Sequence, residues 1–277
     1  MPLIEIRELA FSYPNGIQAL RGVNLTIEDG ESVGIVGRNG SGKTTLVKHF
    51  NALFTPQSGS VLVEGQRTVD REPADLAAII GLVFQNPSDQ IFKSRVWDEV
   101  AFGVRQLGFD GSELESRVSA ALAMIDLEWA ADDHPYDLTL TDRKLICLAS
   151  ILAGEPKIVV LDEPTTAQDQ QGVLRLLDII HQLLDQGRTV ITITHDMDFV
   201  AEAFERTVAM RDGQIILDGP TTEVFRQPEV LETTYVKPPA MSRLGQHLGI
   251  ADSILTTDAM ADWVDAAKNS ATKYVED

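Results

Sequence analysis

The chain has 277 residues, 44% of them hydrophobic and 23% charged, a balance that is typical of a folded globular protein and excludes wholesale disorder. Its 42 acidic and 23 basic residues give a net charge of −19, which argues against broad electrostatic binding to DNA, RNA or anionic lipid, so any polyanionic ligand needs a local site. The single cysteine, Cys147, excludes an intrachain disulfide and a cysteine-rich zinc site, which fits a reducing compartment.

Membrane-spanning and secretory segments are not expected in this sequence. No stretch approaches the ~18 consecutive apolar residues that cross a bilayer, and the first two residues lead directly into a strand-like run at residues 3–6. The sequence therefore predicts a cytosolic protein whose membrane role would run through a partner.

Short strands separated by turn residues are expected along the first sixty or so residues. The strand and turn patterns are strand 3–9, turn 14–16, strand 23–27, turn 29–30, strand 32–36 and, further on, strand 61–65. A glycine-rich loop follows the strand at 32–36, and a helical pattern then runs from Lys43 to Phe54 and ends before Pro56.

Helical periodicity replaces the strand pattern at residues 86–154, which we interpret as an inserted helical subdomain. Its clearest apolar stripe consists of Leu114, Val118, Leu122 and Ile125. The elements expected after it are a strand at 157–161, a helix at 173–184, a strand at 189–194 and a hairpin at 207–217 that turns at 212–213. Strands that alternate with helices predict an α/β fold with a parallel sheet, and the N-terminal strands add antiparallel pieces.

A phosphate-binding loop is predicted where the chain passes from the strand at 32–36 to the following helix. The pattern G-x-x-x-x-G-K-[ST] is matched at every fixed position by Gly37, Arg38, Asn39, Gly40, Ser41, Gly42, Lys43 and Thr44. Glycines let the backbone N–H groups surround phosphate oxygens, Lys43 is expected to neutralise the β- and γ-phosphates, and the Thr44 hydroxyl to bind Mg²⁺. The alternative is a glycine-rich turn that holds no ligand. Thr45 completes the predicted ATP-binding set.

Two adjacent carboxylates follow the apolar strand at 157–161. Asp162 is expected to hold Mg²⁺ through water, and Glu163 to orient or deprotonate an attacking water molecule. The alternative for Glu163 is a cap of the next segment, since Pro164 follows. One carboxylate would suffice for nucleotide binding, so the second favours hydrolysis.

Four further residues, one before and three after the phosphate loop, lie in short sequence phrases. Tyr13, Gln85, Asp169 and His195 lie in the phrases Phe-Ser-Tyr, Val-Phe-Gln-Asn-Pro, Thr-Thr-Ala-Gln-Asp and Ile-Thr-His-Asp. With the phosphate loop they resemble the nucleotide-binding subunit of an ATP-binding cassette (ABC) transporter over roughly the first 225 residues. The resemblance implies that Tyr13 stacks on adenine, Gln85 senses Mg²⁺ and the attacking water, His195 contacts the γ-phosphate, and Asp169 communicates across a dimer.

The resemblance also implies the fold and the domain organisation. We expect a P-loop NTPase with a RecA-like parallel core, an antiparallel β subdomain and the helical subdomain at about 86–154, all within a nucleotide-binding domain at residues 1–226. Residues 227–277 resemble a C-terminal extension that helps to hold two ATPases together. The alternative for this tail is a loosely packed surface helix.

Within that superfamily the phrases around residues 81–103 and 238–258 resemble the energy-coupling factor group, which includes cobalt and nickel importers. The resemblance implies ATP hydrolysis at the cytoplasmic face of the cell membrane, where it powers uptake of a vitamin or a transition metal. The implied partners are a transmembrane energy-coupling subunit, a substrate-binding membrane subunit and a second ATPase, and no nucleic acid. Residues 85–102 are the expected docking surface for the transmembrane partner, with apolar anchors at Ile91, Phe92, Val96 and Trp97. The alternative for Trp97 is a place in the core.

Two other functions fit the phosphate loop less well. A soluble ABC ATPase acting on nucleic acid or ribosomes usually carries tandem cassettes, a coiled-coil insertion or basic arms, whereas this chain shows one cassette and strong negative charge. A small-molecule P-loop kinase would not explain the set of Gln85, Asp169 and His195.

The sequence departs from the family at the signature loop, normally Leu-Ser-Gly-Gly-Gln. Residues 138–142 read Leu-Thr-Leu-Thr-Asp, so Thr139 keeps a hydroxyl while both glycines are lost. Asp142 adds negative charge beside a triphosphate, which is unfavourable unless Arg143 or Lys144 compensates. Because each signature completes the partner's site in this family, we expect a heterodimer in which a standard signature serves this chain's phosphate loop. An active homodimer is the alternative.

Overall fold

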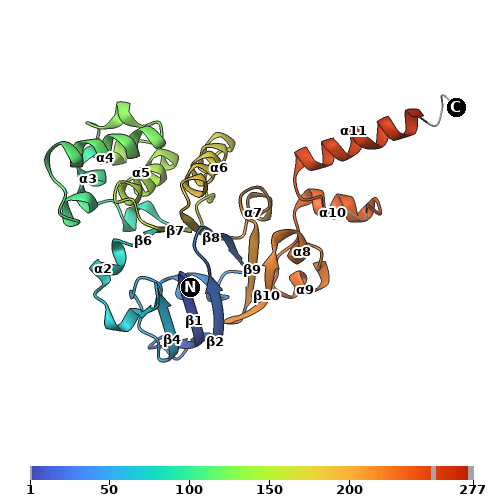
Figure 1. The fold of residues 1–277 in the computed structure, drawn as a ribbon, viewed down its shortest axis with the longest axis horizontal. Helices are drawn as coiled ribbons and strands as arrows, with labels where there is room; N and C mark the ends of the chain where they lie inside the picture. The colour runs from blue at the N-terminus through green and yellow to red at the C-terminus, as the bar shows by residue number, and fades with distance from the viewer. Residues whose placement is uncertain (1, 251–253, 274–277) are drawn as a thin grey trace.

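Six strands form the central sheet of this computed structural model, which describes residues 2–250 and 254–273 (Figure 1). In the order β10-β9-β3-β8-β7-β6 they are Gln214–Pro220, Arg206–Arg211, Ser32–Val36, Thr189–Thr194, Ile158–Asp162 and Ile80–Val83. Neighbours from β9 to β6 pair in parallel, and β10 pairs antiparallel with β9. Strands β3, β7 and β8 are buried along their whole length, which explains their nearly continuous apolar sequences.

A second, antiparallel sheet packs beside the central sheet. In the order β2-β1-β4-β5 its strands are Gln18–Ile27, Ile4–Ser12, Ser58–Val63 and Gln66–Arg67. Its inward side chains and those of the central sheet form one hydrophobic cluster, which includes Ile4, Ile27, Val33 and Phe50. The predicted α/β fold with antiparallel N-terminal strands is therefore confirmed.

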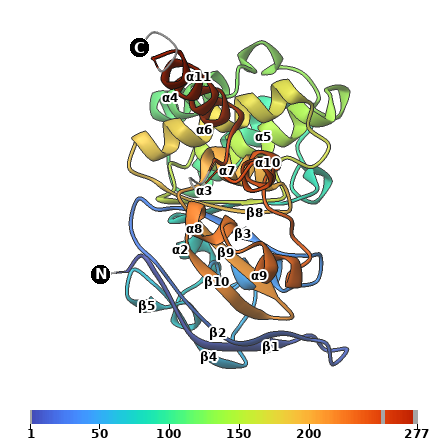
Figure 2. The ribbon, with the colours of Figure 1, turned by 90° about the vertical axis from the view of Figure 1, so that its right-hand side faces the viewer.

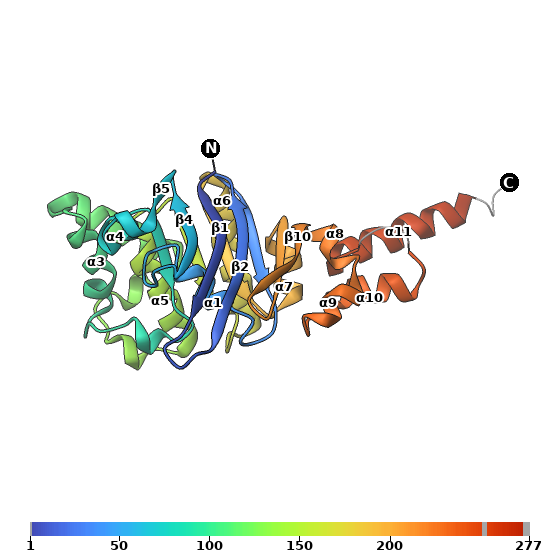
Figure 3. The same ribbon diagram turned by 90° about the horizontal axis from the view of Figure 1, so that it is seen from below.

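Three helices dominate residues 86–154 and lie together at one end of the molecule (Figures 1 and 3). They are α3 (Val96–Gln106), α4 (Gly111–Met124) and α5 (Leu140–Leu152), with 3-10 turns at Pro87–Asp89, Glu128–Ala130 and Pro135–Asp137. The predicted apolar stripe is buried in a second hydrophobic cluster, to which Leu114, Val118, Leu122 and Ile125 all belong. The helical pattern of this region is confirmed.

The remaining helices are distributed around the sheets and along the C-terminal part of the chain. They are α1 (Lys43–Val47), α2 (Pro73–Ala77), α6 (Gln170–Asp185), α7 (Met197–Ala203), α8 (Thr221–Phe225), α9 (Pro228–Thr233), α10 (Ala240–His247) and α11 (Thr257–Lys273), with a 3-10 turn at Thr68–Asp70. Helices α10 and α11 lie at the end of the molecule opposite α3–α5, and α11 points away from both sheets (Figures 1–3). Within the described ranges, no helix combines the length and apolar character needed to cross a membrane.

The helix predicted from Lys43 to Phe54 is shorter than expected, because α1 ends at Val47. The ring Nδ1 of His49 contacts the carbonyl oxygen of Thr45 at 2.7 Å, the acceptor that the backbone N–H of His49 would use in a continuing α-helix. The backbone N–H groups of His49 and Phe50 instead donate to the carbonyls three residues earlier, at 3.1 and 3.0 Å. The segment therefore tightens into turns.

The expected apolar anchors at residues 85–102 also need correction. Ile91 and Val96 are buried, and Trp97 packs against the second hydrophobic cluster, so these three side chains serve the core. Phe92 is exposed as predicted and packs edge-to-face on the partly exposed Phe102. Periodicity alone does not distinguish a buried face from an exposed one when several helices pack on one another.

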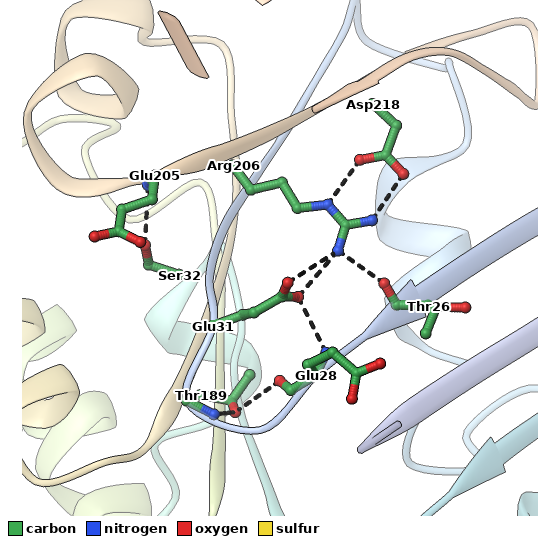
Figure 4. A network of polar contacts seen from close by, with 9 residues as sticks. Thr26, Glu28, Glu31, Ser32, Thr189, Glu205, Arg206 and Asp218 are labelled. Carbon is green, nitrogen blue, oxygen red and sulfur yellow. Dashed lines mark hydrogen bonds and ion pairs between the residues drawn. The ribbon is translucent and has the colours of Figure 1, made fainter. Parts of the chain in front are cut away.

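A polar network around Arg206 joins the two sheets (Figure 4). Its guanidinium donates two hydrogen bonds to the Asp218 carboxylate at 2.7 and 2.8 Å, a third to Glu31 Oε2 at 3.0 Å, and a fourth to the carbonyl oxygen of Thr26 at 2.9 Å. Pairing with Asp218 raises the pKa of Arg206. Because Thr26 lies on β2, and Arg206 and Asp218 lie on β9 and β10, this one side chain links the antiparallel sheet to the edge of the central sheet.

We expect Arg206→Met to lower the free energy of unfolding by about 2 kcal/mol, since charge-assisted hydrogen bonds contribute about 1.5–3 kcal/mol. Arg7→Met is the matched control, because Arg7 on β1 pairs only at the exposed surface with Glu5 and its loss should cost no more than about 0.5 kcal/mol. Urea denaturation of both variants measures the difference. Equal losses would show that the network does not hold the sheets together.

Candidate functional site

The predicted phosphate loop connects β3 to α1 and takes backbone conformations that require glycine. Gly37, Gly40 and Gly42 have φ angles of 147°, 82° and 106°. A Cβ atom on Gly42 would lie 2.6 Å from the carbonyl oxygen of Ala19, whereas a Cβ on Gly40 would meet no atom within 4 Å. The loop is therefore fixed both by its own turns and by close packing against β2.

Lys43 begins α1 and is buried at the centre of the loop. Its ammonium donates to the carbonyl oxygens of Gly37 at 2.7 Å and Arg38 at 3.1 Å. Burial lowers the pKa of Lys43, while the negative charges of Glu163 and Asp162 oppose this shift. The loop thus holds one buried cation next to two carboxylates.

These carboxylates lie at the end of β7, where the strand leads into a tight turn. Burial raises the pKa of Asp162, and the Thr44 hydroxyl donates to its Oδ1 atom at 3.4 Å. Glu163 is buried with a φ of 50°, and its backbone N–H donates to the carbonyl oxygen of Ile193 at 2.7 Å. Its Oε2 atom lies 2.7 Å from Nδ1 of His195, which follows β8. The carboxyl ends of three adjacent strands therefore bring the loop, the carboxylates and the histidine together.

A cavity of about 560 Å³ opens over this cluster. The predicted site residues that line it are Tyr13, Asn39, Gly40, Gly42, Lys43, Thr44, Thr45, Gln85 and Glu163. A neighbouring cavity of about 360 Å³ is lined by three more of them, Gly37, Arg38 and His195. The structure thus places most of the predicted residues around these two neighbouring cavities.

Tyr13 is held against the loop by an aromatic cluster. Its hydroxyl lies 2.8 Å from Oγ1 of Thr45, and its ring packs edge-to-face on Phe11 and Phe54. The His49 ring packs edge-to-face with Phe11 as well, and burial lowers the pKa of His49. Tyr13 therefore has a fixed position at the cavity wall, and Thr45 contacts it directly.

Thr139 and Asp169 do not line either cavity; each caps a helix. The Thr139 hydroxyl donates to Oδ2 of Asp142 at 2.7 Å and accepts the backbone N–H of Asp142 at 3.1 Å, at the start of α5. Asp169 Oδ1 accepts the backbone N–H of Gly172 at the start of α6. These two residues thus form part of a different surface from the predicted ATP-binding set.

Arg143 and Lys144, the two basic residues that could offset the negative charge of Asp142, contact other groups. Lys144 is buried and donates to main-chain carbonyls of residues 163, 164 and 166, away from Asp142. The Arg143 guanidinium lies over the Tyr136 ring, 5.3 Å from its centroid. The position of Lys144 on a helix predicts the direction of its side chain only roughly. The tertiary fold determines which carbonyls its ammonium contacts.

Two residues that contact the predicted loop residue Arg38, Asp212 and Tyr235, were not found by sequence reasoning. Arg38 pairs with Asp212 at 2.6 Å, and its guanidinium lies 4.8 Å from the centroid of the Tyr235 ring. Tyr235 follows α9, so the C-terminal part of the chain contacts the loop directly. No local pattern could indicate these contacts, because they join residues almost two hundred positions apart.

A parallel sheet with a glycine-rich loop after one strand and paired carboxylates after a nearby strand defines a P-loop nucleotide-binding protein. A model of the ABC transporter family matches residues 20–166. The chain belongs to the ABC transporter family, whose nucleotide-binding domains bind ATP.

Several relatives resemble this chain over most of its length. EcfA of Methanoculleus marisnigri, an energy-coupling factor transporter ATP-binding protein, is 38% identical over 272 residues, which cover 96% of this chain and 98% of EcfA. The structure of cbiO1 from Clostridium perfringens, part of the ABC transporter complex cbiONQ, has a TM-score of 0.76 and 32% identity and covers 90% of this chain and 99% of cbiO1. The ATP-binding cassette MJ0796, a dimer in a post-hydrolysis state bound to ADP and Pi, has a TM-score of 0.72 and 28% identity over 79% of this chain and 98% of MJ0796. Three other curated relatives, putative ABC transporter ATP-binding proteins that are 41% to 42% identical to this chain, are longer, and the chain spans only 40% to 43% of their length.

We expect Gly42→Ala to lower the free energy of unfolding by about 2 to 4 kcal/mol, because the added methyl combines an unfavourable φ with a backbone clash. Gly40→Ala shares a positive φ but has open space, so about 1 kcal/mol is expected. Chemical denaturation measures both. The assigned packing of the loop against β2 would be wrong if the two variants lost the same stability.

Proposed function

We propose that this chain is the ATP-binding and ATP-hydrolysing subunit of a membrane importer of the energy-coupling factor type. The observation that carries the proposal is the 2.7 Å contact between Glu163 Oε2 and His195 Nδ1 beside the buried Lys43. Nucleotide binding alone does not require this arrangement, whereas hydrolysis needs a base and a second polar group near the γ-phosphate. The similarity to EcfA along nearly the whole of both chains supports the transport role.

ATP would occupy the larger cavity. Tyr13 would form the wall on which the adenine ring stacks, and the loop residues that line this cavity, Asn39, Gly40 and residues 42–45, would offer backbone N–H groups to the phosphates. Lys43 neutralises the β- and γ-phosphates by transferring its ammonium from the carbonyls of Gly37 and Arg38 to phosphate oxygens. Local geometry in this way holds a polyanion on a chain whose net charge is −19.

The residues present fit Mg²⁺. Thr44 Oγ1 and Asp162 Oδ1 lie 3.4 Å apart, and both are oxygen donors of the kind that Mg²⁺ prefers. No group of three or more His, Cys, Asp or Glu that could hold a metal occurs in the described part of the chain. Mg²⁺ in nucleotide sites uses one or two protein ligands together with phosphate oxygens, and when bound it neutralises developing phosphate charge. Gln85 lines the same cavity and is the third proposed contact.

Glu163 is the proposed general base and His195 the residue that orients it. The carboxylate accepts the Nδ1–H of His195, which leaves Nε2 of the ring for the contact with the γ-phosphate that the family resemblance implies. Burial of Glu163 and its main-chain bond to Ile193 fix the carboxylate relative to the phosphate loop. Positioning and charge stabilisation by Lys43 and the backbone amides supply most of the remaining catalysis.

Glu163→Gln is expected to reduce the rate of ATP hydrolysis by about 10²- to 10⁴-fold, because it removes the base and keeps the shape of the side chain. ATP affinity should stay within a few-fold of the wild type, and the variant, mixed with the second ATPase proposed below, should accumulate as an ATP-bound closed dimer. Phosphate release, nucleotide binding and gel filtration with ATP measure the three effects. Hydrolysis at the wild-type rate would refute the assignment of Glu163.

The second ATPase of the proposed dimer is a different subunit. In the signature loop, the Thr139 hydroxyl is already committed to the Asp142 carboxylate. Leu140 exposes 40% of its surface where the family has a glycine. A carboxylate and a leucine side chain at this position disfavour close approach of a partner's triphosphate. The phosphate loop and Glu163 keep the residues that hydrolysis needs, so the two sites of the dimer are unequal.

We expect the full chain, tagged and purified in detergent, to carry a second ATPase with a Leu-Ser-Gly-Gly-Gln signature and a membrane protein. Hydrolysis per site should rise at least tenfold when the isolated chain is mixed with that ATPase. The matched variant combines Thr139→Ser, Leu140→Gly, Thr141→Gly and Asp142→Gln, and it should hydrolyse ATP without a partner. If isolated and mixed samples had equal activity per site, the proposed asymmetry would be wrong.

The proposed surface for the transmembrane partner is the exposed pair Phe92 and Phe102 at the edge of α3. Lys93 lies 4.8 Å and 4.7 Å from the two ring centroids. An exposed aromatic pair with a neighbouring cation is typical of an interface anchor. Through this surface the chain would lie at the cytoplasmic face of the membrane.

A further inference from the structure

We propose that Lys144 is a positioning residue, whose ammonium fixes the main chain of residues 163–166 and thereby holds Glu163 in place for ATP hydrolysis. The inference rests on the proposed function and adds a residue to it. Lys144 belongs to α5, the helix that begins at the signature loop. The main chain that carries the Glu163 carboxylate is thus bonded to α5.

Three carbonyl oxygens surround the Lys144 ammonium. Nζ donates to the carbonyl of Thr166 at 2.5 Å, to that of Glu163 at 3.2 Å and to that of Pro164 at 3.4 Å. An ammonium carries three N–H donors, so the number of donors and acceptors matches. Lys144 exposes only 9% of its surface, and a buried charge persists only where such partners satisfy it.

The segment that Lys144 contacts has an unusual backbone. Glu163 and Ala167 have φ angles of 50° and 59°, which side chains with a Cβ atom rarely adopt. Such conformations persist only where surrounding contacts over-determine them. Main-chain bonds also hold the turn: the N–H of Glu163 donates to the carbonyl of Ile193 at 2.7 Å, and those of Thr166 and Gln168 donate to carbonyls three residues earlier at 3.3 and 3.1 Å. Lys144 adds a buried side chain that bonds three carbonyls of this turn at once.

The charge of Lys144 is supported by its surroundings. Burial lowers the pKa of Lys144, and the negative charge of Glu163 opposes that shift. A cation with three donors suits a position that three main-chain carbonyls surround.

Helix α5 is also bonded to residues 84–90, which contain Gln85 and are called the glutamine loop below. The amide of Gln90 accepts the backbone N–H of Phe84, the neighbour of Gln85, at 3.1 Å. The same amide donates to the carbonyl of Cys147 at 3.0 Å and to the Ser150 hydroxyl at 3.4 Å, both on α5. A shift of α5 relative to the central sheet would thus move Gln85 and Glu163 together, through Gln90 and Lys144.

Removing the ammonium tests the proposal. In the full chain with ATP and Mg²⁺, we expect Lys144→Met to lower kcat by about 10- to 100-fold while KM for ATP stays within about threefold, because a small misplacement of a catalytic group costs rate and not binding. Lys144→Arg keeps the charge and the donors and should recover at least part of the lost rate. If Lys144→Met does not fold, Lys144→Gln, which keeps two donors, should lower kcat by about tenfold.

Val118→Ala is the matched control, since it destabilises α4 in the same group of helices without touching Glu163. It should lower the melting temperature and leave kcat and KM unchanged. A fall in kcat in the control equal to that in Lys144→Met would assign the effect to stability and overturn the proposal. An unchanged kcat in Lys144→Met would overturn it as well.

A second measurement does not depend on turnover. The chain has five histidines, so the ring resonance of His195 can be assigned by its disappearance in His195→Gln. In Lys144→Met this resonance should shift, because Glu163 Oε2 moves from its position 2.7 Å from Nδ1. No shift would contradict the proposal even if the wild type failed to hydrolyse ATP, whereas that failure alone would refute the proposed function.

Discussion

The site depends on one constraint, the parallel order of β3, β8 and β7 in the central sheet. Parallel strands present their carboxyl ends at the same edge, so the segments that follow them meet there even though they lie far apart in the sequence. The phosphate loop follows β3, His195 follows β8, and Glu163 follows Asp162 at the end of β7. Lys43, Glu163 and His195 are neighbours for this reason, and the buried apolar strands beneath them make the arrangement rigid.

Helix α5 connects this edge to the rest of the molecule. Its first turn contains the altered signature, its second turn holds Lys144 against the turn after β7, and its later residues bind Gln90 in the glutamine loop. A helix is a stiff element, so a displacement at one of these points is transmitted to the others. The altered signature and the buried Lys144 therefore belong to the same helix, so a movement of that helix affects both.

Much of the fold follows from local patterns. Alternating strands and helices predicted the parallel sheet, and the apolar stripe through Leu122 predicted a buried helix face. Two expectations were wrong because tertiary contacts competed with them: the His49 ring takes the Thr45 carbonyl and ends α1 early, and Ile91 and Val96 pack inward between helices. A periodic pattern gives the amphipathic character of a segment but does not show which neighbour covers it.

The sequence by itself determined the chemistry: a phosphate loop, two carboxylates after an apolar strand, a histidine after another, and a signature without its glycines. These features are readable because each requires particular residue types at short spacing. Only the tertiary structure decided which groups meet, including the Arg38 guanidinium over the Tyr235 ring and the Lys144 ammonium at the Glu163 carbonyl. Such contacts join residues far apart in the chain and depend on side-chain direction, which packing sets and local sequence does not.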